Sequence, residues 1–137
     1  MRGEGEAVNY RIEFIPASQI RKEAGPTAGD YFVRDGEVVI QIADTGNRAY
    51  NLLVAHHEFT ERMLNELQGV KDEDVDAFDV ANADCEGEPG DLIGCPYGFQ
   101  HQIATSFERC LCAVLGIPWA EYDQSVATGA ANQSATC

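Results

Sequence analysis

Three histidines, His56, His57 and His101, are the side chains of this sequence best suited to chemistry, because each lies near carboxylates in a segment with helical periodicity. In the segment LLVAHHEFTERML, His57 and Glu61 are four residues apart and share one face of the predicted helix with Leu53. An imidazole and a carboxylate on an apolar face need a hydrogen-bond partner, a counter-charge or a metal ion. These two positions are therefore the first candidates for a functional site.

The spacing of His57 and Glu61 lets both side chains approach one cation, as the two histidines of an HExxH motif do. The run His57 to Glu61 is an HExxE variant of that motif. If the helix that carries His101 packs against it, His101 supplies a third ligand and leaves a fourth position for water. We therefore predict a divalent metal site, with zinc as the expected ion, and Glu58 as the general base that activates the bound water.

A second acidic residue, Glu108, lies on the same predicted helix face as His101 and Ala104. Seven residues separate Glu108 from His101, which is about 10 Å of helix rise, so the two side chains do not easily share one ion. We expect Glu108 in a supporting role. It either pairs with Arg62 or Arg109, or it orients an imidazole.

Other residues are weaker candidates for the site. Asp79 follows an apolar pair in the acidic run DEDVDAFD, and it could act as a supplementary ligand or orient a histidine. Tyr97 could donate a hydrogen bond to an oxyanion near the metal, or it could be a packed aromatic residue with its hydroxyl at the surface. His56 lies off the apolar stripe and is expected at the surface or in a supporting role.

A purely structural interpretation stands beside the metal site, because a histidine that is hydrogen-bonded to a carboxylate within one helix is a frequent outcome without any ion. The five cysteines have no CxxC spacing, and we expect them to be idle or buried thiols. A zinc site made by Cys85 and Cys95 with the pair Cys110 and Cys112 is the less favoured alternative for them.

The remaining sequence predicts the elements that position these residues. An alternating strand over 10–15 and a hairpin over 30–42 that turns at Asp35 and Gly36 form the sheet. A helix over 48–68 begins after Asn47 and ends at Gly69, and a second long helix ends at Gly116. Between these helices we expect an acidic loop that ends near Pro96. A short turn follows Trp119, and the tail is expected to be frayed. The predicted fold class is α+β, a short antiparallel sheet packed on two long helices, with one domain over 1–122 and a flexible tail over 123–137.

The composition limits the classes of partner that we expect this protein to bind. The chain has 137 residues with 9 basic and 23 acidic side chains, a net charge of −14, so nucleic acid is an unfavourable partner. No apolar run approaches the roughly 20 residues of a membrane span, and the first residues have no secretory core, so we expect a cytoplasmic protein. A peptide or protein is the expected substrate or partner. The alternative function is an acidic interaction protein that mimics DNA charge or binds a host factor, with a structural metal or none. The oligomeric state is open.

These motifs resemble those of two groups of proteins. The strand VVIQIAD followed by YNLLVAHHEFTE resembles the minimal unit of zincin metallopeptidases, in which an edge strand lies beside an HExxH helix. The segments LVAHHEFTERML, EPGD and PYGFQHQIATSFERCLCAVLGIPWAEY resemble small phage and prophage proteins with an HExxE helix and a later QH helix, from about residue 30 to 122. The resemblance implies roles for His57, Glu58, Glu61 and His101 in a metal-dependent hydrolase, or in a degenerate zincin without turnover. Because Glu61 replaces the second histidine of HExxH, other divalent ions compete more strongly with zinc.

Overall fold

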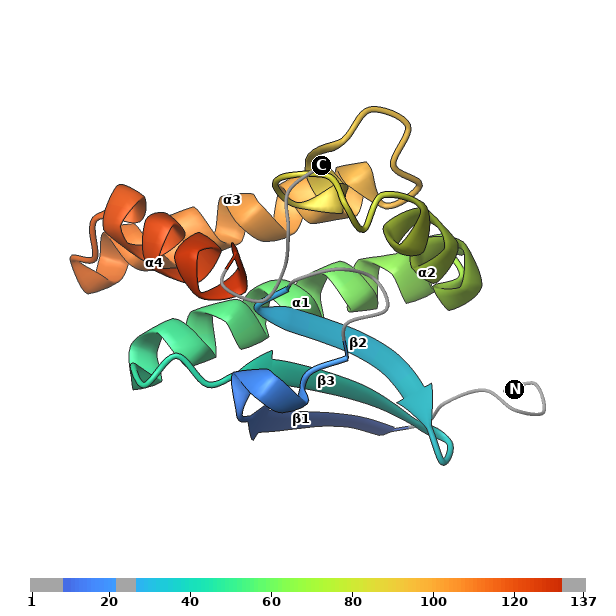
Figure 1. Ribbon diagram of the computed structural model, residues 1–137, viewed down its shortest axis with the longest axis horizontal. Coiled ribbons are helices and arrows are strands. Elements are labelled where there is room, and N and C mark those ends of the chain that lie inside the picture. The colour runs from blue at the N-terminus through green and yellow to red at the C-terminus, as the bar shows by residue number, and fades with distance from the viewer. Residues whose placement is uncertain (1–8, 22–26, 132–137) are drawn as a thin grey trace.

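Three layers make up the fold: a sheet, the long helix α1 on one face of it, and a second layer of helices on the far side of α1 (Figure 1). The computed structural model describes residues 9–21 and 27–131. Its strands are β1 (Asn9–Ile15), β2 (Gly29–Arg34) and β3 (Glu37–Ala43), and its helices are α1 (Arg48–Gln68), α2 (Asp72–Ala81), α3 (Gly98–Leu115) and α4 (Trp119–Ala131), with two single-turn helices η1 (Ala17–Gln19) and η2 (Pro89–Asp91). The predicted α+β class is confirmed.

The sheet has the order β1-β3-β2, and it is mixed, so the prediction of an antiparallel sheet is wrong. The hairpin is confirmed: β2 and β3 are antiparallel, and Asp35 and Gly36 turn with φ of 50° and 76°. However, β1 pairs with β3 in parallel. Strand β2 follows β1 in the chain but is not its neighbour in the sheet. After the hairpin turn, β3 lies between β1 and β2 and pairs with both. Alternating side chains look the same in either arrangement, so the sequence pattern did not reveal this order.

Helix α1 is the centre of the molecule, because it packs against the sheet on one side and against α3 on the other. The sheet side is dry: Val38, Ile40 and Ile42 of β3 are fully buried in one cluster with Leu53 and Val54 of α1. Such burial stabilises the fold by about 2 kcal/mol per side chain. The α1–α3 side holds the polar residues that form the candidate site.

Helix α1 has the predicted bounds and caps, and α3 ends at Gly116 as predicted. The side chain of Asn47 accepts a hydrogen bond from the backbone N–H of Tyr50 at the start of α1, as an N-cap does. Gly69 and Gly116 end α1 and α3 with φ of 77° and 71°, a left-handed conformation that glycine adopts without steric strain.

The acidic segment after Gly69 forms helix α2, so the prediction of a loop is wrong there. Asp72, Glu73 and Asp74 occupy the first turn, where negative charge interacts favourably with the helix dipole. Val75 is buried, and Arg62 of α1 holds Asp72 with Nε 2.9 Å from Oδ1. This tertiary packing offsets the weak periodicity that suggested a loop.

The segment after Pro118 is helix α4, which replaces the predicted turn and the part of the predicted tail up to Ala131. Tyr122 anchors this helix, since its side chain is buried and its hydroxyl donates to Glu108 of α3. The rest of the tail, 132–137, lies outside the described residues. No helix in the described part of the chain is both long and apolar enough to cross a membrane.

Candidate metal centre

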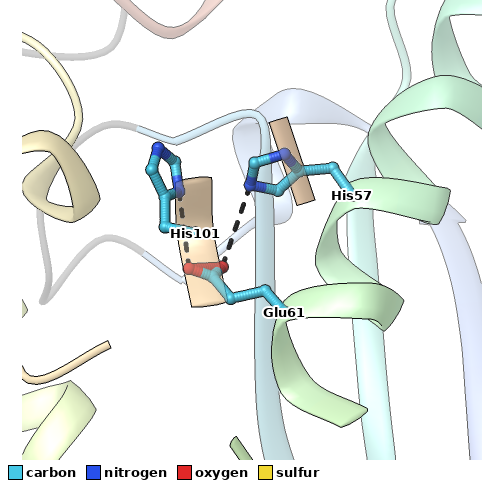
Figure 2. A group of neighbouring side chains, drawn as sticks. All are labelled: His57, Glu61 and His101. Carbon is cyan, nitrogen blue, oxygen red and sulfur yellow. Dashed lines mark ion pairs between the residues drawn. The ribbon is translucent and has the colours of Figure 1, made fainter. Parts of the chain in front are cut away.

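Helices α1 and α3 bring together the three predicted ligands. His57 and Glu61 project from successive turns of α1, and His101 projects from the facing turn of α3. Figure 2 shows the Glu61 carboxylate beside the two imidazole rings, each with one nitrogen toward it. One ligand atom from each residue lies within 4.8 Å of the others, and all three residues are buried.

The distances in this group suit a shared cation better than direct hydrogen bonds. His57 Nε2 lies 3.9 Å from Glu61 Oε2, and His101 Nδ1 lies 3.5 Å from Glu61 Oε1. Strong charge-assisted hydrogen bonds are about 2.7–2.9 Å long. In contrast, two ligands about 2.0–2.1 Å from a tetrahedral ion are about 3.3 Å apart. The observed spacing is therefore close to that of a metal site.

Glu61 is itself evidence for a ligand. The residue is only 4% exposed, and its Oε1 atom is buried without a hydrogen-bond partner in the described part of the chain. The ion pair with His101 Nδ1 at 3.5 Å is longer than a strong hydrogen bond, so it replaces the lost hydration of this oxygen only in part. A cation bound between Oε1 and the two imidazoles would replace the rest.

A buried relay fixes the ring of His57. Its Nδ1 atom lies 2.9 Å from Glu108 Oε1, and an ionised carboxylate only accepts, so the ring nitrogen donates. The other oxygen of Glu108 accepts from the hydroxyl of Tyr122. This arrangement directs Nε2 toward Glu61, as a carboxylate does behind a metal-binding histidine. Of the two supporting arrangements predicted for Glu108, the structure shows the contact with an imidazole.

The ring of His101 has the opposite environment. Its Nε2 atom lies 3.0 Å from Glu88 and 3.1 Å from Asp91, whose side chains are 61% and 62% exposed. Glu88 precedes η2 and Asp91 is its last residue, and Gly90 between them packs against the ring: a Cβ at Gly90 would lie 2.6 Å from His101 Nδ1. The loop thus covers His101 closely and leaves Nδ1 facing Glu61.

Electrostatics favour the charged forms of both rings when no ion is bound. Burial lowers the pKa of His57, but its hydrogen bond with Glu108 and the charge of Glu58 outweigh that effect and raise the pKa to about 9. Burial also lowers the pKa of His101, whereas its contacts with the carboxylates of Glu61 and Glu88 raise it to about 11. Protons then balance the buried carboxylates, and a metal ion would compete with those protons.

Glu58 lies outside the three-ligand group but lines the same cavity. Its side chain packs closely against the backbone of β2 at Gly29. A Cβ at Gly29 would lie only 2.5 Å from Glu58 Cγ. Burial raises the pKa of Glu58 well above its ordinary value, and the charge of Glu61 raises it further.

The weaker predictions about supporting residues have mixed outcomes. Asp79 and Tyr97 contact each other, since the hydroxyl of Tyr97 donates to Asp79, and within the described ranges neither belongs to a group that could hold a metal. Asp79 therefore orients no histidine, and the Tyr97 hydroxyl is neither at the surface nor free for an oxyanion. His56 is exposed, as predicted, with Nδ1 3.4 Å from Thr60 Oγ1. None of the described cysteines joins such a group, and Cys137 lies outside the described residues.

Sequence reasoning missed the residues that hold the two imidazoles from outside. Glu88 and Asp91 lie in the turn EPGD, which gives no sign that it folds over His101. Tyr122 lies in a segment that was predicted to be a turn. The available signal for α4 was the spacing of Trp119 and Tyr122, which are three residues apart and so lie on one face of a helix.

Comparison of this chain with protein-family models, with curated proteins and with solved structures finds no match in any of the three. The resemblance to zincins and to phage proteins therefore stays a prediction.

Proposed function

We propose that this protein is a metal-dependent hydrolase, with His57, Glu61 and His101 as the ligands of a divalent ion, zinc in the first instance. The observation that carries the proposal is the buried carboxylate of Glu61 between two imidazoles, whose Oε1 atom lies 3.5 Å from His101 Nδ1 without a hydrogen bond. Three protein ligands leave a coordination position open, which is typical of hydrolytic sites and not of closed structural sites.

The proposed reaction is the hydrolysis of a peptide or other amide. A bound divalent ion supplies Lewis acidity and lowers the pKa of water to about 7. Glu58 accepts a proton from the attacking water and returns it to the leaving amine. Its place in the cavity beside the three ligands supports this role, because a general base must reach the proton that it accepts.

The first part of the proposal to test is metal binding. The adjacent residues His57 and His56 serve as a predicted ligand and its matched control. Protein purified without a polyhistidine tag is loaded with zinc, dialysed and analysed for metal, as wild type, His57→Gln and His56→Gln. We expect one ion per chain in the wild type and in His56→Gln, whose ring is exposed, and a loss in His57→Gln. His101→Gln on the other helix repeats the test if His57→Gln does not fold. A wild type without bound metal, with a melting temperature unchanged by chelator, would contradict the proposal.

The second part of the proposal to test is catalysis by Glu58. Glu58→Gln should keep its metal and lose about 10²–10⁴-fold in turnover of a fluorogenic peptide mixture. Glu73→Gln, an exposed position in the first turn of α2, is the matched control and should retain turnover. Unchanged turnover in Glu58→Gln would remove the assigned base.

The predicted alternative, an acidic interaction protein, rests on the net charge of −14. Such a protein would bind a basic partner with steep salt dependence, and its binding would survive Glu58→Gln. The same variant therefore separates the two functions.

A further inference from the structure

A cavity of about 720 Å³ adjoins the candidate metal centre. Its volume lies in the range of pockets that bind drug-sized ligands, about 300–1,000 Å³. Glu58, Glu61, His57 and His101 all line it, so a ligand in this cavity would reach both the metal ligands and the proposed base. The chemistry of the rest of the lining then indicates what kind of substrate the site accepts.

The lining is strongly acidic. Ten of the lining residues are aspartate or glutamate, two are arginine, and His57 and His101 are protonated when no ion is bound, so the formal difference is 10 − 2 − 2, or six negative charges. A bound ion with two positive charges would take the place of those two protons and leave the same difference of six. The acidic character therefore exceeds what a metal centre alone requires.

The two arginines do not offset this charge at the metal centre. Arg21 is already paired, with Nε 2.7 Å from Asp30 Oδ2 and Nη2 3.1 Å from Asp76 Oδ1. The guanidinium of Arg109 lies 4.7 Å from the centroid of the Trp119 ring, where it is held by a cation–π contact. Among the described residues, neither arginine forms an ion pair with Glu61 or Asp123, and the charge of Arg109 only opposes the raised pKa of Asp123.

The mouth carries carboxylates that the metal centre does not use. Glu86 and Asp123 are exposed and form no ion pair with any residue in the described ranges. Partial burial raises the pKa of Asp123, and the charges of Glu88 and Glu108 raise it further. The negative charges around the cavity thus act on one another across its opening.

We infer that the substrate carries a positive charge, an ammonium or guanidinium group, beside the amide that is cleaved. This inference rests on the proposed hydrolase. An uncompensated negative potential in a concave, partly dry site concentrates cations and repels carboxylates. Cationic peptides are therefore favoured over neutral ones, and acidic peptides are excluded.

The test measures binding of three blocked pentapeptides, Ala-Ala-Xaa-Ala-Ala, in which Xaa is lysine, acetyl-lysine or glutamate. Calorimetry uses the Glu58→Gln chain, metal-free and zinc-loaded, so that no peptide is cleaved. At low salt the lysine peptide should bind at least about tenfold more tightly than the acetyl-lysine peptide, which is about 1.4 kcal/mol. The difference should shrink between about 0.01 M and about 1 M salt, as screening requires. Equal binding, no binding, or preference for glutamate would overturn the inference.

A variant at the mouth sharpens the test. Glu86→Gln combined with Asp123→Asn should reduce the preference for lysine several-fold, while Asp35→Asn on the distant hairpin turn, the matched control, should leave it unchanged. A wild-type preference in the double variant would overturn the inference. If the wild type binds lysine selectively but hydrolyses none of the peptides with metal bound, the hydrolase fails. If it hydrolyses all three at the same rate, only the charge selectivity fails.

Discussion

The two histidines of the candidate metal centre are held from outside by different kinds of carboxylate. Behind His57, the carboxylate of Glu108 is 9% exposed and receives a second hydrogen bond from the buried hydroxyl of Tyr122. Behind His101, the carboxylates of Glu88 and Asp91 are mostly exposed. In both cases a carboxylate holds one ring nitrogen so that the other faces Glu61. For His57 this carboxylate is in the interior, and for His101 it is at the surface.

The difference has an energetic consequence. A charge in the interior interacts strongly with its partner because water does not screen it, whereas an exposed pair contributes about 0–1 kcal/mol. The exposed side also has two carboxylates, so either can replace the other. We therefore expect the α1 side of the centre to be sensitive to single substitutions and the loop side to tolerate them.

The largest effect should come from Glu108→Gln. This substitution removes the charge behind His57 and leaves a protonated ring without its buried partner, so the metal-free protein should lose about 3 kcal/mol of unfolding free energy. Zinc affinity should fall about 10–100-fold. Urea unfolding and chelator competition measure the two effects. The double variant Glu88→Gln with Asp91→Asn is the comparison, and an equal loss there would contradict the proposed contrast.

The pH dependence of the metal-free protein comes next. The folded-state pKa of His57 is about 9, above its ordinary value of 6.5, so protonation stabilises the folded form. This stabilisation is complete below about pH 6.5 and is lost as pH rises through about 9, by up to about 3 kcal/mol. The loss continues at higher pH as His101 titrates, with a pKa of about 11. Urea midpoints across this range measure it. Stability that increases over the same range would contradict the assignment.

An intermediate effect is expected for Tyr122→Phe. The substitution leaves one oxygen of Glu108 buried without a donor, which should lower the unfolding free energy by about 1–3 kcal/mol. Tyr50→Phe is a matched control, because the ring of Tyr50 contacts that of Tyr122 edge to face with centroids 5.2 Å apart. Equal stability of the two variants in thermal unfolding would show that the hydroxyl of Tyr122 is not part of the relay.

The smallest effect is expected for Asp91→Asn. Glu88 remains beside His101 Nε2, so unfolding free energy should change by less than about 1 kcal/mol. Zinc affinity should change by less than about fivefold, because 1 kcal/mol corresponds to that factor. A loss as large as that of Glu108→Gln in the same chelator competition would show that the exposed loop is as important as the buried relay.

The parts of the fold that local signals determine were predicted from the sequence. Asn47 and Gly69 fixed the ends of α1, and the Asp35-Gly36 pair fixed the hairpin, because caps and tight turns depend on a few neighbouring residues. The parallel pairing of β1 with β3 depends on how a long connection crosses the sheet, which no local pattern encodes. Helices α2 and α4 depend on tertiary anchors such as Val75 and Tyr122.

The grouping of His57, Glu61 and His101 was predictable for a related reason. His57 and Glu61 are one helical turn apart, and His101 is the only histidine elsewhere in the chain, so helix packing had few alternatives to bring together. The supporting residues were harder to predict. Glu88, Asp91 and Tyr122 come from a turn and from an unpredicted helix, and only the folded chain places them behind the imidazoles.

One small residue gives experimental access to the proposed base. Gly29 on β2 lies against Glu58 so closely that even a methyl group would push that carboxyl aside. Gly29→Ala would therefore move Glu58 without altering any ionisable group, any ligand or the net charge. Turnover in that variant would report how accurately the acid must be placed, separately from whether its charge is needed.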